Sequence, residues 1–258
     1  MSELEALTRA HQLAQIRTGG LAALTIGELG NQLSAGKISL DEFTLAGVGV
    51  EKLGHQSSVN LAADYMRLSR RIQASDLVGR KLEVPPFQLS EAMARAVSTR
   101  AVLERGVDDE FWAIVGRYST WADRAVKQAG RDLVVNSASA AGSRWRRVSD
   151  GSPCAFCAML VGRGPVYGSA ASAAGVVGRG RASKTRGSQA LGSRFHDHCG
   201  CTVEEVPSGV EWAPTETEQK FADLYEASKG GDVAEVTARM RQLGSGVIND
   251  ATAQKKDA

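Results

Sequence analysis

The cysteines of this chain are gathered in two short groups, and that placement constrains the fold more than any other feature of the sequence. One group reads Cys-x-x-Cys and the other His-x-His-Cys-x-Cys, so they hold all four cysteines and two of the four histidines. A C-x-x-C turn presents two thiolates at a spacing that suits a tetrahedral zinc ion, and the second group can supply the remaining ligands. The sequence therefore predicts one zinc site. Its candidate ligands are Cys154, Cys157, His196, His198, Cys199 and Cys201.

Six candidates compete for four positions around a tetrahedral zinc ion. We favour Cys154 and Cys157, joined by one histidine and by at least one of Cys199 and Cys201. A structural zinc is favoured over a catalytic one, because a small segment with few large apolar residues needs a metal to stabilise its fold. No catalytic residue is predicted.

Two other uses of paired cysteines fit the sequence less well. Disulfides would require an oxidising compartment, whereas the N-terminus, Met1–Glu5, lacks the basic region and apolar run of a secretory signal. A thioredoxin-like redox pair would require a βαβ context, and this C-x-x-C follows a helical region. Zinc binding is therefore the favoured interpretation.

Zinc enzymes with related signatures need residues that are missing here. A zinc deaminase needs an upstream H-x-E, but His11 and His55 are not followed by glutamate at that position. A centre of the HNH nuclease type needs a further histidine downstream of His198, and none follows. Glu204 or Glu205 could act as a base beside an open zinc position, although the spacing does not demand it.

The first half of the chain reads as helical, because its apolar residues recur three and four positions apart. Gly19-Gly20 predicts the end of a first helix, and Gly36 the end of a second. Glycines at positions 47, 49 and 54 weaken the case for one unbroken helix after Ser39. Val84-Pro85-Pro86-Phe87 predicts a break. The expected helices span residues 4–17, 25–33, 39–72, 90–105 and 108–141.

From about Ser143 the composition shifts to short strands, turns and sequence rich in glycine and serine. Strands are predicted at 145–148 and 202–206, a long exposed loop at 162–193, and helices at 216–228 and 232–243. The expected fold is mainly α, with a helical N-terminal domain followed by a small zinc-stapled α+β unit and a short helical tail. The corresponding ranges are 1–141, 142–207 and 208–258.

The net charge is only +2, so any affinity for nucleic acid must rest on a local group of charges. No acidic residue lies between Asp150 and Asp197, while basic residues recur through that stretch. They would bind phosphates electrostatically and without reading the sequence, and a solubilising loop is an equally good interpretation. The candidate nucleic-acid-binding residues are Arg179, Arg181, Lys184 and Arg186. No apolar run approaches the ~20 residues of a membrane-spanning helix, and we expect no membrane partner.

Several segments resemble the MuF-like minor capsid, or head morphogenesis, proteins of tailed phages, and those of actinobacterial phages most of all. The likeness covers most of the chain, but only the segments with cysteine and histidine are specific. The segments that carry it are Trp145-x-Arg147-Val148, Ser152–Leu160, Arg163–Tyr167, Phe195–Cys201, Leu61–Tyr65, Trp212 and Phe221–Tyr225.

The resemblance implies a virion protein that acts in head assembly, made in the host cytoplasm and packaged inside the procapsid. Its implied partners are the portal protein and the major capsid protein, with packaged DNA as a further partner of the basic loop. In that family the second group usually reads H-x-x-C-x-C, which matches His196, Cys199 and Cys201 and favours His196 over His198. The long Gly/Ser/Arg-rich insert departs from the family pattern.

The alternative from another class is a capsid maturation protease or other zinc-dependent hydrolase. A serine protease needs a histidine base, and outside the zinc group only His11 and His55 are available. We therefore expect a protein that works without turnover and docks a partner through its helical half. The segment Leu61–Met66 could form such a docking surface, although a place in the core is the favoured interpretation.

Overall fold

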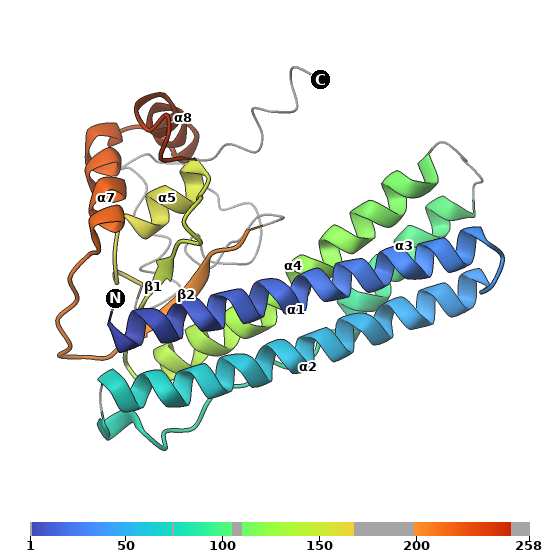
Figure 1. Ribbon diagram of the computed structural model, residues 1–258, viewed down its shortest axis with the longest axis horizontal. Helices are drawn as coiled ribbons and strands as arrows, with labels where there is room; N and C mark the ends of the chain where they lie inside the picture. Colours follow the sequence, from blue (N-terminus) through green and yellow to red (C-terminus); the bar gives the residue numbers. More distant parts are fainter. Residues whose placement is uncertain (1, 74, 105–109, 168–198, 249–258) are drawn as a thin grey trace.

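The computed structural model describes residues 2–73, 75–104, 110–167 and 199–248. Within these ranges the fold is mainly α, with seven α-helices, one short 3-10 helix and a two-stranded sheet. Three long helices form an arm, and the sheet and the last three helices of the chain gather at one end of it (Figure 1). The predicted fold class is confirmed.

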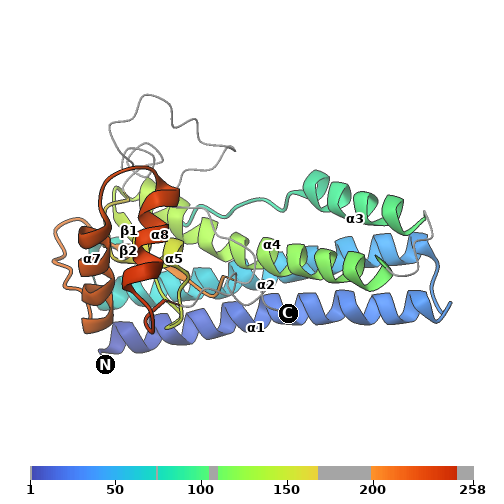
Figure 2. The same cartoon turned by 90° about the horizontal axis from the view of Figure 1, so that it is seen from above.

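The arm consists of α1 (Glu3–Ser34), α2 (Leu40–Gln73) and α4 (Phe111–Ala140), which pack against one another along their lengths. The shorter α3 (Leu89–Leu103) packs on α2 and α4 at the end of the arm that lies away from the sheet (Figure 2). Each long helix buries one stripe of residues against the other two, as an amphipathic helix of a bundle does.

The predicted end of the first helix at Gly19-Gly20 is wrong, because α1 continues through both glycines to Ser34. A side chain at Gly19 would collide with Asp123, and Lys127 would crowd it as well. The glycine therefore allows a close approach of α4, and tertiary packing outweighs the low helix propensity of glycine. The predicted stop near Gly36 is confirmed, since that residue has a φ of 66°.

The helix predicted after Ser39 is unbroken, despite its three glycines. Ser39 Oγ accepts a hydrogen bond from the backbone N–H of Glu42 at 3.2 Å, so Ser39 is the N-cap of this helix. A Cβ atom built on Gly47 would lie 2.5 Å from the hydroxyl oxygen of Tyr118 on α4. Glycine is again the residue that lets two helices of the arm meet closely.

The break predicted at Val84–Phe87 is confirmed, since no helix covers residues 78–88. A single 3-10 turn, η1 (Ser75–Leu77), follows α2, and the chain then runs extended to α3. The helices predicted at 90–105 and 108–141 correspond to α3 and α4.

Both predicted strands are present, as β1 (Arg144–Val148) and β2 (Thr202–Val206), and they pair in antiparallel register. Arg146 lies opposite Glu204 in this register. Tyr167 extends the pairing on the other side of β1, where its carbonyl accepts from the Trp145 N–H at 3.0 Å and the two rings stack. Tyr167 is the last residue described before the chain resumes at Cys199.

Three shorter helices complete the end of the arm that carries the sheet. The first, α5 (Ala155–Val161), was not predicted from the sequence, and its N-cap is Cys154. The predicted C-terminal helices correspond to α7 (Glu216–Ser228) and α8 (Val233–Leu243), and each begins with a capping box. These helices pack against one another and hold the sheet from the side away from the bundle.

Buried ion pairs connect the sheet to the helices on both sides of it. Arg70 on α2 donates through Nε to Glu205 at 2.7 Å, and both side chains are fully buried. Arg146 on β1 pairs with Glu204 across the sheet at 2.8 Å and also with Glu218 on α7. Because the loss of one partner would leave a buried charge uncompensated, these pairs fix the position of the sheet.

One hydrophobic core runs from the bundle through the sheet to the last helices. It includes Ala62, Ala63, Tyr65 and Met66, so most of the candidate docking segment Leu61–Met66 lies in the core. The division at residues 141 and 207 stays a prediction, and residues from all three predicted parts contribute to this core.

The predicted nucleic-acid-binding role of the basic loop stays a prediction. Arg179, Arg181, Lys184 and Arg186 lie outside the described residues, as does most of the loop predicted at 162–193. Among the described helices, none combines the length and the apolar character needed to cross a membrane.

Candidate metal centre

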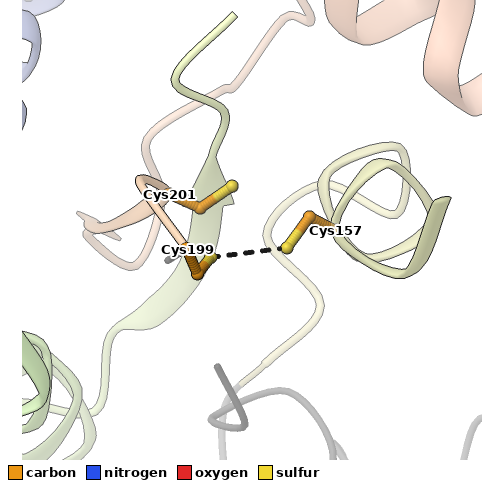
Figure 3. Close-up of side chains that lie close together, drawn as sticks. All are labelled: Cys157, Cys199 and Cys201. Atoms are coloured by element: carbon orange, nitrogen blue, oxygen red, sulfur yellow. Dashed lines mark hydrogen bonds between the residues drawn. The ribbon is translucent and has the colours of Figure 1, made fainter. Parts of the chain in front are cut away.

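Three cysteines meet where α5 approaches the start of β2. The Sγ atoms of Cys157, Cys199 and Cys201 all lie within 4.8 Å of one another. Cys157 comes from α5, and its thiol faces the other two, which precede β2 (Figure 3). The Sγ atoms of Cys157 and Cys199 are 3.5 Å apart, and each side chain of the three is at least 97% buried. The two groups of cysteines, far apart in the sequence, thus converge at one point.

The remaining ligand candidates are placed differently. Cys154 is half-buried, and its Sγ accepts a hydrogen bond from the Cys157 N–H at 3.5 Å, so it caps the helix that carries Cys157. It adjoins the group of three cysteines without belonging to it. His196 and His198 lie outside the described residues. The structure therefore brings together three of the four ligands that a tetrahedral zinc ion needs, and the identity of the fourth ligand stays a prediction.

Two buried arginines supply positive charge beside the thiols. Arg147 on β1 is fully buried, and its Nη1 lies 3.8 Å from Sγ of Cys157. Arg131 on α4 is 4% exposed, and its charge acts on all three thiols. Nearby guanidinium groups stabilise a thiolate, which is the form of cysteine that binds metals.

The thiols perturb one another because they are crowded in a buried space. The pKa of Cys199 lies well below its usual range, because Cys157 and Cys201 hydrogen-bond to its thiolate and Arg131 lies near it. The pKa of Cys157 is raised, because its thiol donates within a cluster formed with Cys154, Cys199 and Cys201. One negative charge is therefore favoured and further ones repel each other. A divalent cation that replaces the thiol protons would offset the repulsion between the thiolates with its own positive charge.

Side chains of the bundle hold the backbone of the second cysteine group. Arg131 Nη2 donates to the carbonyls of Cys199 at 2.7 Å and of Cys201 at 2.8 Å. Gln12 on α1 donates to the carbonyl of Gly200 at 3.0 Å. Three consecutive carbonyls are thus held by α1 and α4. A side chain at Gly200 would collide with Asp150, so this turn also requires glycine.

These supporting residues were not predicted from the sequence. Gln12 and Arg131 lie on helices distant in sequence from either cysteine group, and helical periodicity alone cannot show which polar residue faces a metal site. Arg147 enters the sequence analysis only as part of a matched segment. The alternation of β1 gives a weak signal, because it places Arg147 and Trp145 on one face.

The donor set fits a thiolate-rich metal site. Three buried sulfur atoms on two segments supply most of a tetrahedral shell, and soft thiolate ligands favour zinc over the hard cations. Cys154, His196 or His198 would complete the shell. A metal bound here would join α5 to the start of β2, two short elements that both contribute to the hydrophobic core.

The other titratable residues considered in the sequence analysis lie in packing or ion-pair environments. Glu204 and Glu205 point to Arg146 and Arg70, so their carboxylates join the sheet to the neighbouring helices. His11 stacks on Tyr65 with ring centroids 4.3 Å apart. Burial, with a contribution from the charge of Arg131, lowers the pKa of His11 to about 3 and keeps the ring neutral.

His55 lies away from the metal centre, near the middle of α2. Its Nε2 atom is 3.1 Å from the carbonyl oxygen of Pro85, and its ring packs edge-on against Phe87. Partial burial lowers the pKa of His55. The histidine thus ties the extended segment before α3 to the arm.

Comparison with known proteins assigns the chain to a family. The model of a family described as "VG15 protein" matches residues 50–228, a stretch that contains the three-cysteine group and its supporting arginines. No curated protein and no solved structure matches the chain.

Proposed function

The chain belongs to the VG15 protein family, which is phage-associated, and on that premise we propose that it is a minor capsid protein of the MuF-like kind that acts in head morphogenesis. Its place is inside the procapsid, beside the portal. One observation carries the proposal. Cysteines from the Cys-x-x-Cys group and from the second cysteine group meet in a single buried cluster, within the part of the chain that matches the family.

The proposed metal is zinc, with a structural role. Three buried thiols and two buried guanidiniums suit a site that binds its metal firmly. The backbone around the cluster is held by Arg131 and Gln12, so the ligands are positioned by the bundle. In this proposal the fourth ligand is Cys154 or a histidine of the second group, with His196 preferred from the family resemblance.

The proposed partners are the portal protein and the major capsid protein. The long arm offers an extended helical surface to such partners (Figure 1). Packaged DNA is a further proposed partner, through the basic residues of the segment between Tyr167 and Cys199. The protein acts by binding, without turnover.

Co-expression with the portal and major capsid proteins of the same phage tests the proposal. Procapsids are purified and their content of this protein is measured by quantitative mass spectrometry. We expect a few copies per particle for the full chain, and a large loss for Cys157→Ser. Ser57→Ala, at an exposed position of α2, serves as the control and is packaged normally.

Two outcomes would overturn the proposal. If the full chain is absent from procapsids and from DNA-filled heads, it is not a head protein. If the major capsid protein is instead cleaved at a specific site in its presence, and Cys157→Ser abolishes the cleavage, the chain is a hydrolase of the alternative class.

A further inference from the structure

The outer face of α1 carries a regular stripe that the bundle leaves exposed. Leu21 is 66% exposed and Leu24 is 74% exposed, although both are large apolar residues at the middle of a long helix. We call this stripe the α1 seam. The residues of the seam are Leu13, Arg17, Leu21, Leu24, Glu28 and Asn31.

The seam has the spacing of a helix-pairing surface. From Arg17 to Asn31 its members follow one another at intervals of four, three, four and three residues, which is the 3.5-residue repeat of a coiled coil, and Leu13 extends the stripe by one further turn. The residues that α1 buries against the bundle, such as Ala22 and Ile26, belong to a different stripe. A solvent-facing stripe of a bundle helix is normally polar, so the two neighbouring leucines form an apolar patch that a second surface can cover.

The charges of the seam are arranged symmetrically about its leucines. Arg17 precedes Leu21 by four residues, and Glu28 follows Leu24 by four residues. If a second α1 lies antiparallel to the first, with a two-fold axis between residues 22 and 23, Leu21 meets the partner's Leu24. In the same arrangement Arg17 meets the partner's Glu28. A parallel pair would instead place like charges together, which is unfavourable.

Neither charge forms an ion pair inside the described part of the chain, although Lys37 lies near enough to Glu28 to contribute to the lowering of its pKa. Arg17 has no ion pair among residues 2–73, 75–104, 110–167 and 199–248. Glu28 accepts hydrogen bonds only from the neutral amides of Asn31 at 3.0 Å and Gln32 at 3.5 Å, both on its own helix. Both side chains are exposed and available to a partner.

The surface beside the seam has room for the side chains of a second helix. A hollow of about 470 Å³ lies between α1 and the start of α4, lined by residues that include Ala23, Gly27 and Trp112. A Cβ atom built on Gly27 would meet no atom within 4 Å. Trp112 is 53% exposed at the edge of this hollow, and α1 runs along the outer edge of the arm, where a second molecule can reach it (Figure 2).

We propose that the occupant of this surface is a second copy of the same chain, so that two molecules pair antiparallel through their α1 seams. The interface is isologous, because each copy contributes the same leucines and the same two charges. Leucines form its centre, and two Arg17–Glu28 pairs border them. This inference does not depend on the proposed role in head assembly, since it concerns the purified chain alone.

Sedimentation equilibrium of the purified full chain, with its metal bound, tests the pairing. We expect a reversible monomer–dimer equilibrium. Leu24→Asp removes the dimer, whereas Leu53→Asp, at a position 73% exposed on α2, leaves it unchanged. Both leucines are exposed, so circular dichroism should show the same helix content and melting for the two variants.

Charge reversal tests the antiparallel register. Arg17→Glu alone and Glu28→Arg alone each place two like-charged pairs in the interface, and each should weaken the dimer by about tenfold or more. The double variant Arg17→Glu with Glu28→Arg restores the dimer, because both pairs are again opposite in sign. A monomer at every concentration would overturn the proposal, and so would a double variant that is as weak as either single variant.

Discussion

Arg131 of α4 donates to the carbonyl of Cys201 through both Nε and Nη2, at 3.1 and 2.8 Å. The same Nη2 reaches the carbonyl of Cys199. One side chain therefore joins α4 of the arm to the turn that carries two thiols. Binding of a metal at this turn and packing of the bundle are coupled through it.

Zinc content and stability should depend on the buried cysteines. We expect about one zinc ion per chain, and Cys157→Ser should lower the free energy of unfolding by several kcal/mol, because metal binding is coupled to folding. Elemental analysis of unchelated protein and urea unfolding measure the two quantities. Freshly purified protein without zinc, and with the stability of the chelated form, would contradict the assignment.

Arg131→Lys should weaken metal binding even though it keeps the positive charge. Lysine cannot hold two carbonyls with a planar fork, so the turn between Cys199 and Cys201 loses its orientation. Loss of such a supporting contact costs roughly 10–100-fold in metal affinity. Competition with a coloured chelator measures the affinity. The control is Arg124→Lys, at a half-buried position on the same helix, and an equal loss in both variants would exclude a specific role for Arg131.

The buried pair between Arg70 and Glu205 should be sensitive to the loss of one partner. Arg70→Met leaves a carboxylate that is fully buried, so it should cost about 3–5 kcal/mol of stability. Adding Glu205→Gln to that variant should recover part of the loss, because the remaining charge is removed. Urea unfolding measures both. Arg67→Met, which removes an exposed pair with Asp64, should have little effect.

Adjacent glycines of α1 should respond in opposite directions to alanine. Gly19→Ala should destabilise the protein, because the new methyl group would collide with Asp123. A Cβ atom on Gly20 would meet nothing within 4 Å, so Gly20→Ala should stabilise the helix by about 0.5–1 kcal/mol. Thermal unfolding of the two variants measures the difference. Equal shifts would show that α4 does not approach α1 as described.

The low pKa of His11 makes stability depend on pH. In the folded protein the pKa is about 3, below the ordinary value of 6.5. The unfolded chain therefore binds a proton that the folded chain does not, and stability falls as the pH drops below 6.5. The slope contributed by this residue approaches about 1.4 kcal/mol per pH unit. His11→Gln should flatten the pH profile of unfolding measured with excess zinc, and an unchanged slope would contradict the buried neutral ring.

Much of the fold follows from local patterns in the sequence. The strands were predictable because residues 145–148 and 202–206 carry β-forming residues and turn signals, and α7 and α8 because their caps are explicit. The end predicted at Gly19-Gly20 failed because the need for glycine comes from α4, which lies far along the chain. Helix α5 was not predicted because its seven residues make too few turns to show the 3.6-residue repeat of apolar positions.

The metal site was predictable only in part, for a similar reason. Spacing of Cys154 and Cys157, and of Cys199 and Cys201, indicated two pairs of donors, and the structure brings three of these four thiols into one group. The ligand set as a whole stays a prediction. The positions of Arg131 and Gln12 beside the metal site depend on how α1, α2 and α4 pack, and no local pattern in the sequence encodes that packing.

Tyr167 and Cys199, which flank residues 168–198 in the sequence, are both held by contacts with the fold. Tyr167 is pinned to Trp145 by a backbone hydrogen bond and by ring stacking, and Cys199 is held by Arg131. The second cysteine group is therefore positioned by its contacts with α4 and β1 rather than by its covalent connection to Tyr167. The metal centre can thus take its geometry only once α4 and β1 have folded together.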